Sequence, residues 1–278
     1  MIIIADSSAS RTEWVLVDEG AVVEHAFTKG LNPFFQTRRE ISHSIRLELP
    51  EAFLKRRWEH IYFYGAGCSN SDKKKVVEAS LVAQFKTPVT VESDLLGAAR
   101  GLLINEPGIA CILGSGSNSC YYDGKYIVKN VRSLGFVLGD EGSASYIGKR
   151  FVSDCLKDIA PEQLRNSFYE YINKTPDEIM SSVYDNSLPG NTLSVYSRFL
   201  MDKIDQDYVY SIISDSFDQF FKRNVVQYDY EGKVVCFVGS NACAYSGILH
   251  EVAEKYNITI KKILPSSIPG LAKYHSVE

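Results

Sequence analysis

The chain has 278 residues, more than one hydrophobic core usually holds, so its length predicts two domains. Hydrophobic residues make up 45% of it and charged residues 23%, which excludes a disordered, collagen-like or membrane-embedded class of protein. The formal net charge is −4 and the basic residues are scattered, which argues against a nucleic-acid partner.

The first residues and the cysteines indicate where the protein works. Residues 1–6 are a short apolar run that ends in an acid, without the basic leader of a secretory signal. No run approaches the roughly 20 apolar residues needed to span a bilayer. The six cysteines have no close metal-type spacing, which favours buried, reduced thiols over disulfides or a metal site. We therefore expect a cytoplasmic protein without a membrane partner.

Short runs rich in Val and Ile predict buried strands, because they are apolar on both faces. In chain order these runs are residues 1–5, 61–64, 89–91, 109–113 and 234–238. Runs at 14–17 and 120–122 predict hairpin partners, so the sheets should be mixed. Helical patterns alternate with the strands, as in a layered α/β protein, and they cover residues 71–85, 94–104 and 207–227.

The same outline of strand, small-residue loop and second strand occurs near the N-terminus and again from about residue 109. This repetition predicts two similar lobes with a cleft between them, because ligands of open α/β sheets bind beyond the carboxyl ends of the strands. We expect an N-terminal lobe at 1–106 and a C-terminal lobe at 107–265. The second lobe should carry a helical insertion at about 151–205, and a helix at about 266–278 should pack back on the first.

The loop at residues 6–14 leaves one predicted strand and enters the next. Asp6 is a candidate to hold Mg²⁺ through water, because magnesium keeps most of its hydration. Ser10, Arg11 and Thr12 are candidates to approach phosphates with hydroxyl, guanidinium and backbone donors. The alternative is a serine-rich hairpin turn in which Asp6 accepts local backbone hydrogen bonds.

Two further small-residue loops follow the strands at 109–113 and 234–238. The first is Gly114-Ser115-Gly116-Ser117, whose backbone N–H groups are typical of a nest that binds phosphate oxygens. It has neither the Walker spacing nor the dinucleotide fingerprint, and an ordinary hairpin turn is the alternative. The second loop consists of Gly239, Ser240, Asn241 and Ala242, and it opens a predicted helix. Its small residues would let a nucleotide approach closely; the alternative is a plain strand-to-helix turn.

Three polar positions are candidates to face a substrate. Asp140 and Glu141 stand between glycines ahead of an apolar helix, where they either accept hydrogen bonds from sugar hydroxyls or cap that helix. Asp94 is a candidate general base at the start of a helix, or its N-cap, unless Ser93 does the capping. Asn32 precedes a proline, and its amide either closes a turn or binds a substrate hydroxyl.

Taken together in this order, these segments resemble the family of ATPases that includes N-acetylglucosamine kinase and the activators of benzoyl-CoA reductase and hydroxyacyl-CoA dehydratases. The resemblance spans nearly the whole chain and rests on residues 6–14, 114–117, 138–143 and 239–242. It implies two actin-like (ribonuclease H-like) ATPase lobes, each a mixed sheet flanked by helices. A homodimer is the assembly that it suggests.

The resemblance also implies ATP-dependent phosphorylation of an amino sugar, N-acetylglucosamine above others, with ATP and Mg²⁺ as cofactors. By this resemblance Asp94 is the base that accepts the proton of the attacking hydroxyl, and Asp6 is the residue that holds the metal. The sugar-facing set is Asn32, Asp94, Ser117 and Asp140. The nucleotide-binding set is Ser10, Arg11, Thr12, Gly114, Ser115, Gly116, Gly239, Ser240 and Ala242.

One departure from the family leaves alternatives open. Ser7 and Ser8 stand where the family usually has glycines, and serine is strained where φ is positive. A non-catalytic sugar or nucleotide sensor is therefore one alternative. The other is an ATPase that drives electron transfer to a partner through a cysteine-ligated iron–sulfur cluster, which the positions of Cys111 and Cys120 beside the second loop argue against. The sequence does not identify the sugar or the hydroxyl that is phosphorylated.

Overall fold

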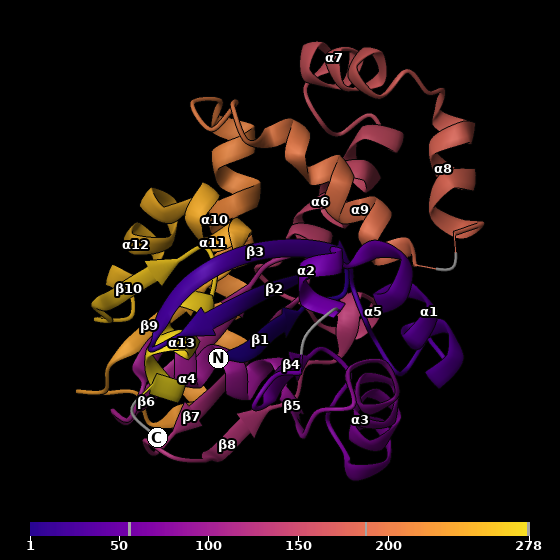
Figure 1. The fold of residues 1–278 in the computed structure, drawn as a ribbon. Coiled ribbons are helices and arrows are strands. Elements are labelled where there is room, and N and C mark those ends of the chain that lie inside the picture. The colour runs from indigo at the N-terminus through magenta and orange to yellow at the C-terminus, as the bar shows by residue number, and fades with distance from the viewer. Residues whose placement is uncertain (55–56, 187, 277–278) are drawn as a thin grey trace. The chain divides into compact units, whose positions relative to one another are not determined.

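A computed structural model describes residues 1–54, 57–186 and 188–276 (Figure 1). Residue 187 of the predicted insertion and residues 277–278 of the predicted C-terminal helix lie outside the described residues. Among the described residues, no helix has both the length and the hydrophobicity to cross a bilayer.

The chain divides into two compact units. The first consists of Met1–Ala110, Tyr122–Val128 and Ser266–Glu278, and the second of Cys111–Tyr121 and Lys129–Pro265. The polypeptide therefore passes between the units several times.

The first unit is built on a mixed five-stranded sheet with the strand order β3-β2-β1-β4-β5. Strands β1 to β3 form antiparallel pairs, whereas β4 and β5 run parallel to β1. The bounds are β1 Ile2–Ser7, β2 Arg11–Asp18, β3 Ala21–Lys29, β4 Ile61–Gly65 and β5 Val89–Ser93. The strands predicted at 1–5, 61–64 and 89–91 and the partner at 14–17 are confirmed. Strand β3 was not predicted, because polar pairs such as Glu24-His25 interrupt its apolar residues and every second side chain is exposed, as in an edge strand.

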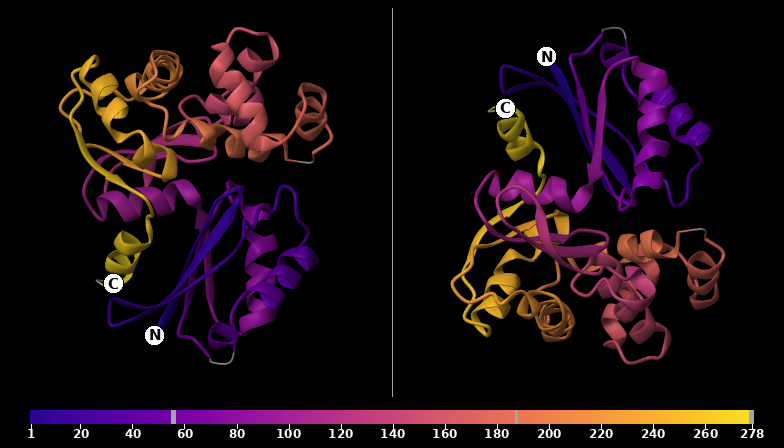
Figure 2. Two further views of the ribbon diagram at one scale, coloured as in Figure 1. Left: turned by 90° about the horizontal axis from the view of Figure 1, so that it is seen from above. Right: turned by 90° about the horizontal axis from the view of Figure 1, so that it is seen from below.

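Helices cover both faces of this sheet (Figure 2). Two buried clusters form on its faces, one with Ile41 and Val77 among its members and the other with Ile268 and Leu271. The helices of this unit are α1 Arg38–Glu48, α2 Glu51–Leu54, α3 Ser71–Phe85, α4 Asp94–Leu103 and α13 Ile268–Ser276. The predicted helix at 71–85 is confirmed with the same bounds, and the one at 94–104 ends one residue earlier.

Helices α4 and α13 approach each other at two glycines. A Cβ on Gly270 would lie 1.8 Å from the carbonyl oxygen of Gly101, and a Cβ on Gly101 would lie 2.6 Å from the carbonyl oxygen of Ser267. Both positions therefore need glycine for the space it leaves rather than for its backbone freedom.

Gly270→Ala is expected to lower the free energy of unfolding by about 2 to 3 kcal/mol, because the added methyl group forces two helix backbones apart. Gly247→Ala in the second unit is the matched control, because no atom lies within 4 Å of its Cβ position. In that helix alanine should instead stabilise by about 0.5 to 1 kcal/mol. Urea unfolding followed by circular dichroism measures both free energies. A Gly270→Ala variant as stable as the wild type would contradict the close contact between α4 and α13.

A second five-stranded sheet has the order β10-β9-β6-β7-β8, with β9 and β10 parallel. Its strands are β6 Gly108–Leu113, β7 Ser117–Tyr122, β8 Ile127–Val131, β9 Val235–Val238 and β10 Ile260–Leu264. The strands predicted at 109–113 and 234–238 and the partner at 120–122 are confirmed. Between β7 and β8 the Asp123 carboxylate accepts hydrogen bonds from the N–H groups of Lys125 and Tyr126, at 2.8 and 2.7 Å, which closes the hairpin turn.

Most helices of the second unit lie between β8 and β9 in the sequence. They are α5 Gly135–Leu138, α6 Ala144–Leu156, α7 Glu162–Ile172, α8 Pro176–Tyr184, α9 Pro189–Ser197 and α10 Asp207–Arg223, with α11 Ser240–Ala244 and α12 Ser246–Glu254 after β9. Pro176 and Pro189 stand in the first turns of α8 and α9, where proline needs no N–H partner. The helix predicted at 207–227 ends as an α-helix at Arg223 and is followed by the 3₁₀ turn Val225–Tyr228.

Candidate functional site

The parallel strands of the first sheet bring two loops and the start of helix α4 to one edge of the first unit. Ser7 of β1 pairs with Gly65 of β4, and Gly65 pairs with Ser93 of β5, so these strands end at the same level. The Ala66 N–H donates to the Ser7 carbonyl at 2.7 Å, which holds two of the loops together. Asp6 and Asp94 therefore belong to one edge, as expected for a ligand site of an open α/β sheet.

Asp6 and Asp94 are partly buried carboxyl groups that repel each other. Burial raises the pKa of Asp6 to about 7, and the negative charges of Asp94 and Glu13 contribute, against a hydrogen bond from Ser267 that lowers it. The Asp6 Oδ2 atom accepts this bond from the Ser267 hydroxyl. Burial likewise raises the pKa of Asp94 to about 6, against the Leu95 N–H that favours the ionised form.

The start of α4 assigns capping to Ser93 rather than to Asp94. The Ser93 hydroxyl accepts the Leu96 N–H at 3.2 Å, which is the contact of an N-cap residue. Asp94 is the first helical residue, and its Oδ1 accepts the Leu95 N–H at 2.8 Å. The interpretation of Asp94 as the cap is therefore wrong, and Ser93 is confirmed in that role.

Ser7 and Ser8 fit the first loop without backbone strain. Neither belongs to the described residues with positive φ, so glycine is not needed at either position. The buried Ser7 hydroxyl is hydrogen-bonded to the Thr12 hydroxyl at 2.7 Å and accepts the Leu31 N–H at 2.9 Å. The Ser8 hydroxyl donates to the Arg11 carbonyl at 3.0 Å and closes the turn between β1 and β2.

The predicted phosphate-contacting residues of this loop differ in exposure. Ser10 and Arg11 are exposed, and the Arg11 guanidinium lies 4.6 Å from the centre of the Phe27 ring. Thr12 is fully buried, and its hydroxyl donates to the Lys29 carbonyl at 3.0 Å. The Thr12 side chain thus joins β2 to β3. Contact of Ser10, Arg11 and Thr12 with a nucleotide stays a prediction.

Asn32 closes a turn with its side chain. Its Oδ1 accepts the Phe34 N–H at 2.9 Å, and its own N–H donates to the Gln36 carboxamide at 2.8 Å. Gly67, with φ of +81°, lies against this side chain, since a Cβ there would be 2.3 Å from Asn32 Oδ1. The turn interpretation is confirmed, and contact of Asn32 with a substrate stays a prediction.

In the second unit, Asp140 is packed against the loop that follows β6. Its Oδ1 accepts the Ser117 N–H at 3.2 Å, and a Cβ on Gly116 would lie 3.2 Å from its Oδ2. Burial raises the pKa of Asp140 and the charge of Glu141 adds to this, against the Ser117 N–H, which favours the ionised form. Asp140 has a φ of +59°, an uncommon value that aspartate tolerates better than most residues.

The N-terminus of α6 holds the Gly114–Gly116 turn from the other side. Backbone N–H groups of Ala144 and Ser145 donate to the carbonyls of Gly114 and Ser115, at 2.9 and 3.1 Å. Ser143 is the N-cap of α6, because its hydroxyl accepts the Tyr146 N–H at 3.1 Å. The alternative in which Asp140 or Glu141 caps this helix is therefore wrong.

The loop after β9 lies against the loop after β6. A Cβ on Gly239 would be 2.3 Å from the Leu113 carbonyl oxygen, and its φ of +129° is one that L side chains rarely adopt. Asn241 Nδ2 donates to the Gly142 carbonyl at 2.7 Å. The predicted helix opening is confirmed by α11, with Ser240 exposed and Ala242 fully buried. The three predicted segments of the second lobe thus meet at one place in the second unit.

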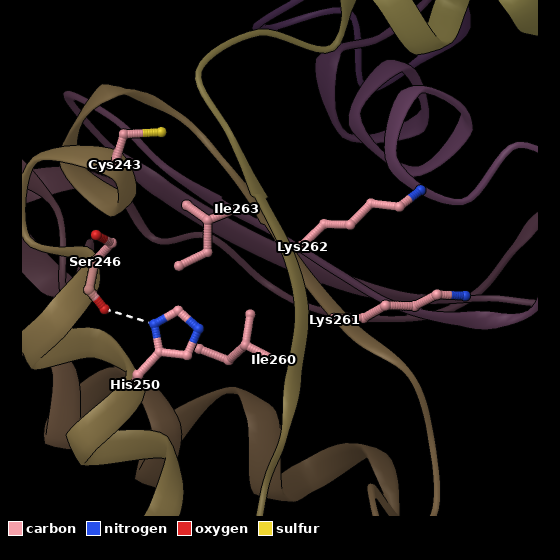
Figure 3. A pocket seen from close by; sticks show the side chains of 7 residues that line it. All are labelled: Cys243, Ser246, His250, Ile260, Lys261, Lys262 and Ile263. Atoms are coloured by element: carbon pink, nitrogen blue, oxygen red, sulfur yellow. Dashed lines mark hydrogen bonds between the residues drawn. The ribbon is translucent and has the colours of Figure 1, made fainter.

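Neither the cysteines nor a hollow in the second unit supplies another residue to the two groups described above. No disulfide joins the six cysteines, which all lie in the described ranges; five of them are buried and Cys243 is partly exposed. No group of three or more His, Cys, Asp or Glu that could hold a metal ion occurs in the described part of the chain. A hollow of about 390 Å³ between α12 and β10 is lined by Cys243, Ser246, His250, Ile260, Lys261, Lys262 and Ile263 (Figure 3).

Sequence reasoning missed two features of the first unit's site. The Gly65–Gly67 loop was not singled out, although two glycines directly after a buried strand are a readable signal. Ser267 follows β10 and directly contacts Asp6, and the only signal for it is a pair of serines after a strand.

The sequence matches no protein-family model and no curated protein, but solved structures match it. The putative N-acetylglucosamine kinase from Porphyromonas gingivalis is 37% identical over 100% of this chain and 99% of its own, with a TM-score of 0.95. The putative N-acetylglucosamine kinase from Chromobacterium violaceum is 14% identical over 100% and 98%, with a TM-score of 0.74. A ROK family glucokinase from Streptomyces griseus, solved with glucose and AMPPNP, is 15% identical over 99% and 98%, with a TM-score of 0.60.

The two distant structures share the fold, and the Porphyromonas structure shows the family. Two mixed five-stranded sheets with flanking helices are the actin-like ATPase architecture that the resemblance implied. An identity of 37% over the full length of both chains goes beyond a shared fold. The chain belongs to the family of N-acetylglucosamine kinase-like proteins within the actin-like ATPases.

Proposed function

We propose that the protein is an ATP-dependent sugar kinase that phosphorylates an amino sugar, N-acetylglucosamine before others, by in-line phosphoryl transfer. The relative with 37% identity is named as a putative N-acetylglucosamine kinase, and the Streptomyces structure of the same fold holds a hexose and an ATP analogue. Fold alone does not fix function, so the proposal depends on the chemistry of the site.

The observation that carries the proposal is the position of Asp94. Its carboxyl group stands at the end of parallel strand β5, beside Asp6, at the first turn of α4. A pKa of about 6 leaves it ionised at neutral pH yet more basic than an ordinary aspartate. Asp94 would accept the proton of the sugar hydroxyl as that oxygen attacks the terminal phosphate of ATP.

The residues around Asp6 fit a magnesium ion that arrives with the nucleotide. Carboxylate oxygen is the donor that Mg²⁺ prefers, and the charges of Asp94 and Glu13 around Asp6 favour a cation. Asp6 alone would hold the ion through water, since Mg²⁺ usually combines one or two carboxylates with waters and substrate phosphates. Once bound, Mg²⁺ neutralises the charge on the phosphates.

The second unit would bind the nucleotide and the sugar through its three converging segments. Gly114, Ser115 and Gly116 form the turn that we assign to the phosphates, and the exposed Ser240 at the start of α11 would approach the nucleoside. Because Ala242 is fully buried, it would act by shaping this loop. Asp140 and Ser117, joined by a hydrogen bond, would present a carboxylate and a hydroxyl to the sugar.

The sensor alternative loses the observation that motivated it, since Ser7 and Ser8 have backbone conformations that serine adopts without strain. The redox alternative finds little support in the thiols. Cys111 and Cys120 are fully buried, and burial raises the pKa of Cys111 well above its ordinary value, whereas a cluster ligand must be a thiolate.

The purified protein should be incubated with Mg-ATP and a panel of amino sugars and hexoses. ADP is followed by a coupled assay and sugar phosphate by mass spectrometry. We expect ADP and sugar phosphate in equal amounts with an amino sugar, fastest with N-acetylglucosamine. ADP without sugar phosphate would point to an ATPase that serves a partner, and nucleotide binding without either product would point to a sensor.

A further inference from the structure

The geometry points to Ser267 as a positioning residue that fixes the orientation of the Asp6 carboxylate toward a nucleotide-bound magnesium ion. This inference rests on the proposed function for the role of Asp6. Ser267 lies 261 positions away from Asp6 in the sequence, and its hydroxyl donates to Asp6 Oδ2. Because its hydroxyl is bonded to the Asp6 carboxylate, it would act through Asp6.

The hydrogen bond distinguishes the two oxygens of Asp6. With Oδ2 occupied by the Ser267 hydroxyl, Oδ1 is the oxygen that would accept from a water on the metal. A carboxylate without such a partner rotates about its terminal torsion, which is broad and roughly two-fold. Fixing the rotation therefore sets where the Asp6 charge points before the nucleotide binds.

Ser267 is itself held in place by two helices. Its exposed fraction is 1%, and its carbonyl accepts the Leu271 N–H at 2.9 Å in the first turn of α13. A Cβ on Gly101 of α4 would lie 2.6 Å from the Ser267 carbonyl oxygen and 2.8 Å from its Cβ. The backbone of Ser267, whose hydroxyl bonds to Asp6, is thus packed closely against helix α4, which begins at Asp94.

The neighbouring serine makes a different contact and serves as the matched control. The Ser266 hydroxyl donates to Glu13 Oε2 at 2.8 Å and accepts the Ile268 N–H at 3.1 Å. Ser266→Ala and Ser267→Ala remove the same atom from adjacent residues ahead of α13. If the substitutions only disturb the docking of α13, both variants should lose ATP affinity and turnover. If the contact with Asp6 matters, only Ser267→Ala should lose them.

The test measures the affinity for ATP by calorimetry with Mg²⁺ and with EDTA, and the turnover of the sugar that the panel identifies. Ser267→Ala should reduce the gain in affinity that Mg²⁺ gives by about 10-fold, and kcat by about 10- to 100-fold. Affinity in EDTA should change less than twofold. Ser266→Ala should match the wild type in each quantity, and Ser267→Ala should add no loss to Asp6→Asn.

An unchanged Mg²⁺ effect in Ser267→Ala, an equal loss in Ser266→Ala, or a loss that adds to that of Asp6→Asn would each overturn the positioning role. So would a wild-type protein whose ATP affinity does not depend on Mg²⁺. If no sugar is phosphorylated while Mg²⁺ still strengthens ATP binding, only the kinase proposal fails, because the calorimetric comparison of the two serine variants is then still decisive.

Discussion

Asp94→Asn is expected to lower kcat for sugar phosphorylation by about 10³-fold, within the range of general-base contributions. The substituted amide cannot accept the proton of the attacking hydroxyl. Its oxygen can still accept the Leu95 N–H, and Ser93 continues to cap α4, so the helix start should be unchanged. Binding of sugar and Mg-ATP should therefore persist within a few-fold, which places the loss in the chemical step.

The matched control is Asp72→Asn, since Asp72 is an exposed acid in the first turn of the preceding helix α3. Steady-state kinetics should give wild-type values for this variant. Titration calorimetry with the sugar separates binding from turnover in both variants. If Asp94→Asn keeps kcat within tenfold of the wild type, another group accepts the proton and the assignment of the base is wrong.

The sequence was sufficient for the strands and loops whose signal is local. Strands β1, β4 and β9 are continuous apolar runs, and such runs are recognisable because both faces of the strand are buried. The loops after β1 and β9 could be predicted as ligand sites, because carboxyl ends of strands are where open α/β sheets bind ligands. Strand β3 was not predicted because its polar residues, among them Glu24 and His25, interrupt the apolar pattern.

The remaining features of the site depend on contacts between distant parts of the chain or on backbone angles. The bond from Ser267 to Asp6 joins the residue before the last helix to the first strand, and no local pattern contains it. Whether Ser7 and Ser8 are strained could not be judged without their φ angles. Likewise, both Asp94 and Ser93 are good N-cap residues, and only the structure tells which one accepts the Leu96 N–H.

Asp6→Asn is expected to stabilise the apoprotein at pH 8 while it removes the Mg²⁺-dependent part of nucleotide binding. The pKa of Asp6 is about 7 in the folded protein against an ordinary value of 3.8, so the folded state binds the proton more tightly than the unfolded state. Between these values stability falls as the pH rises, and above pH 7 the full cost of the buried charge is present. Asparagine carries no charge and can still accept the Ser267 hydroxyl hydrogen bond.

The gain in the free energy of unfolding should be small near pH 4, increase through pH 7 and then level off. We expect a plateau of about 1 to 3 kcal/mol. This is less than the shift in the Asp6 pKa implies, because Asp6 is only partly buried. Urea unfolding at pH 4.5 and pH 8 measures it. Asp72→Asn should show no such gain, because a first-turn acid is stabilised by its helix when ionised. Saturating Mg-ATP should stabilise the wild type more than the variant, since a ligand at 100 times its Kd adds about 2.7 kcal/mol to the protein that binds it and the variant keeps only the Mg²⁺-independent part of that binding. A variant that is less stable than the wild type at pH 8 without nucleotide would show that the Asp6 charge is already compensated within the fold, and would remove the reason for a cation beside it.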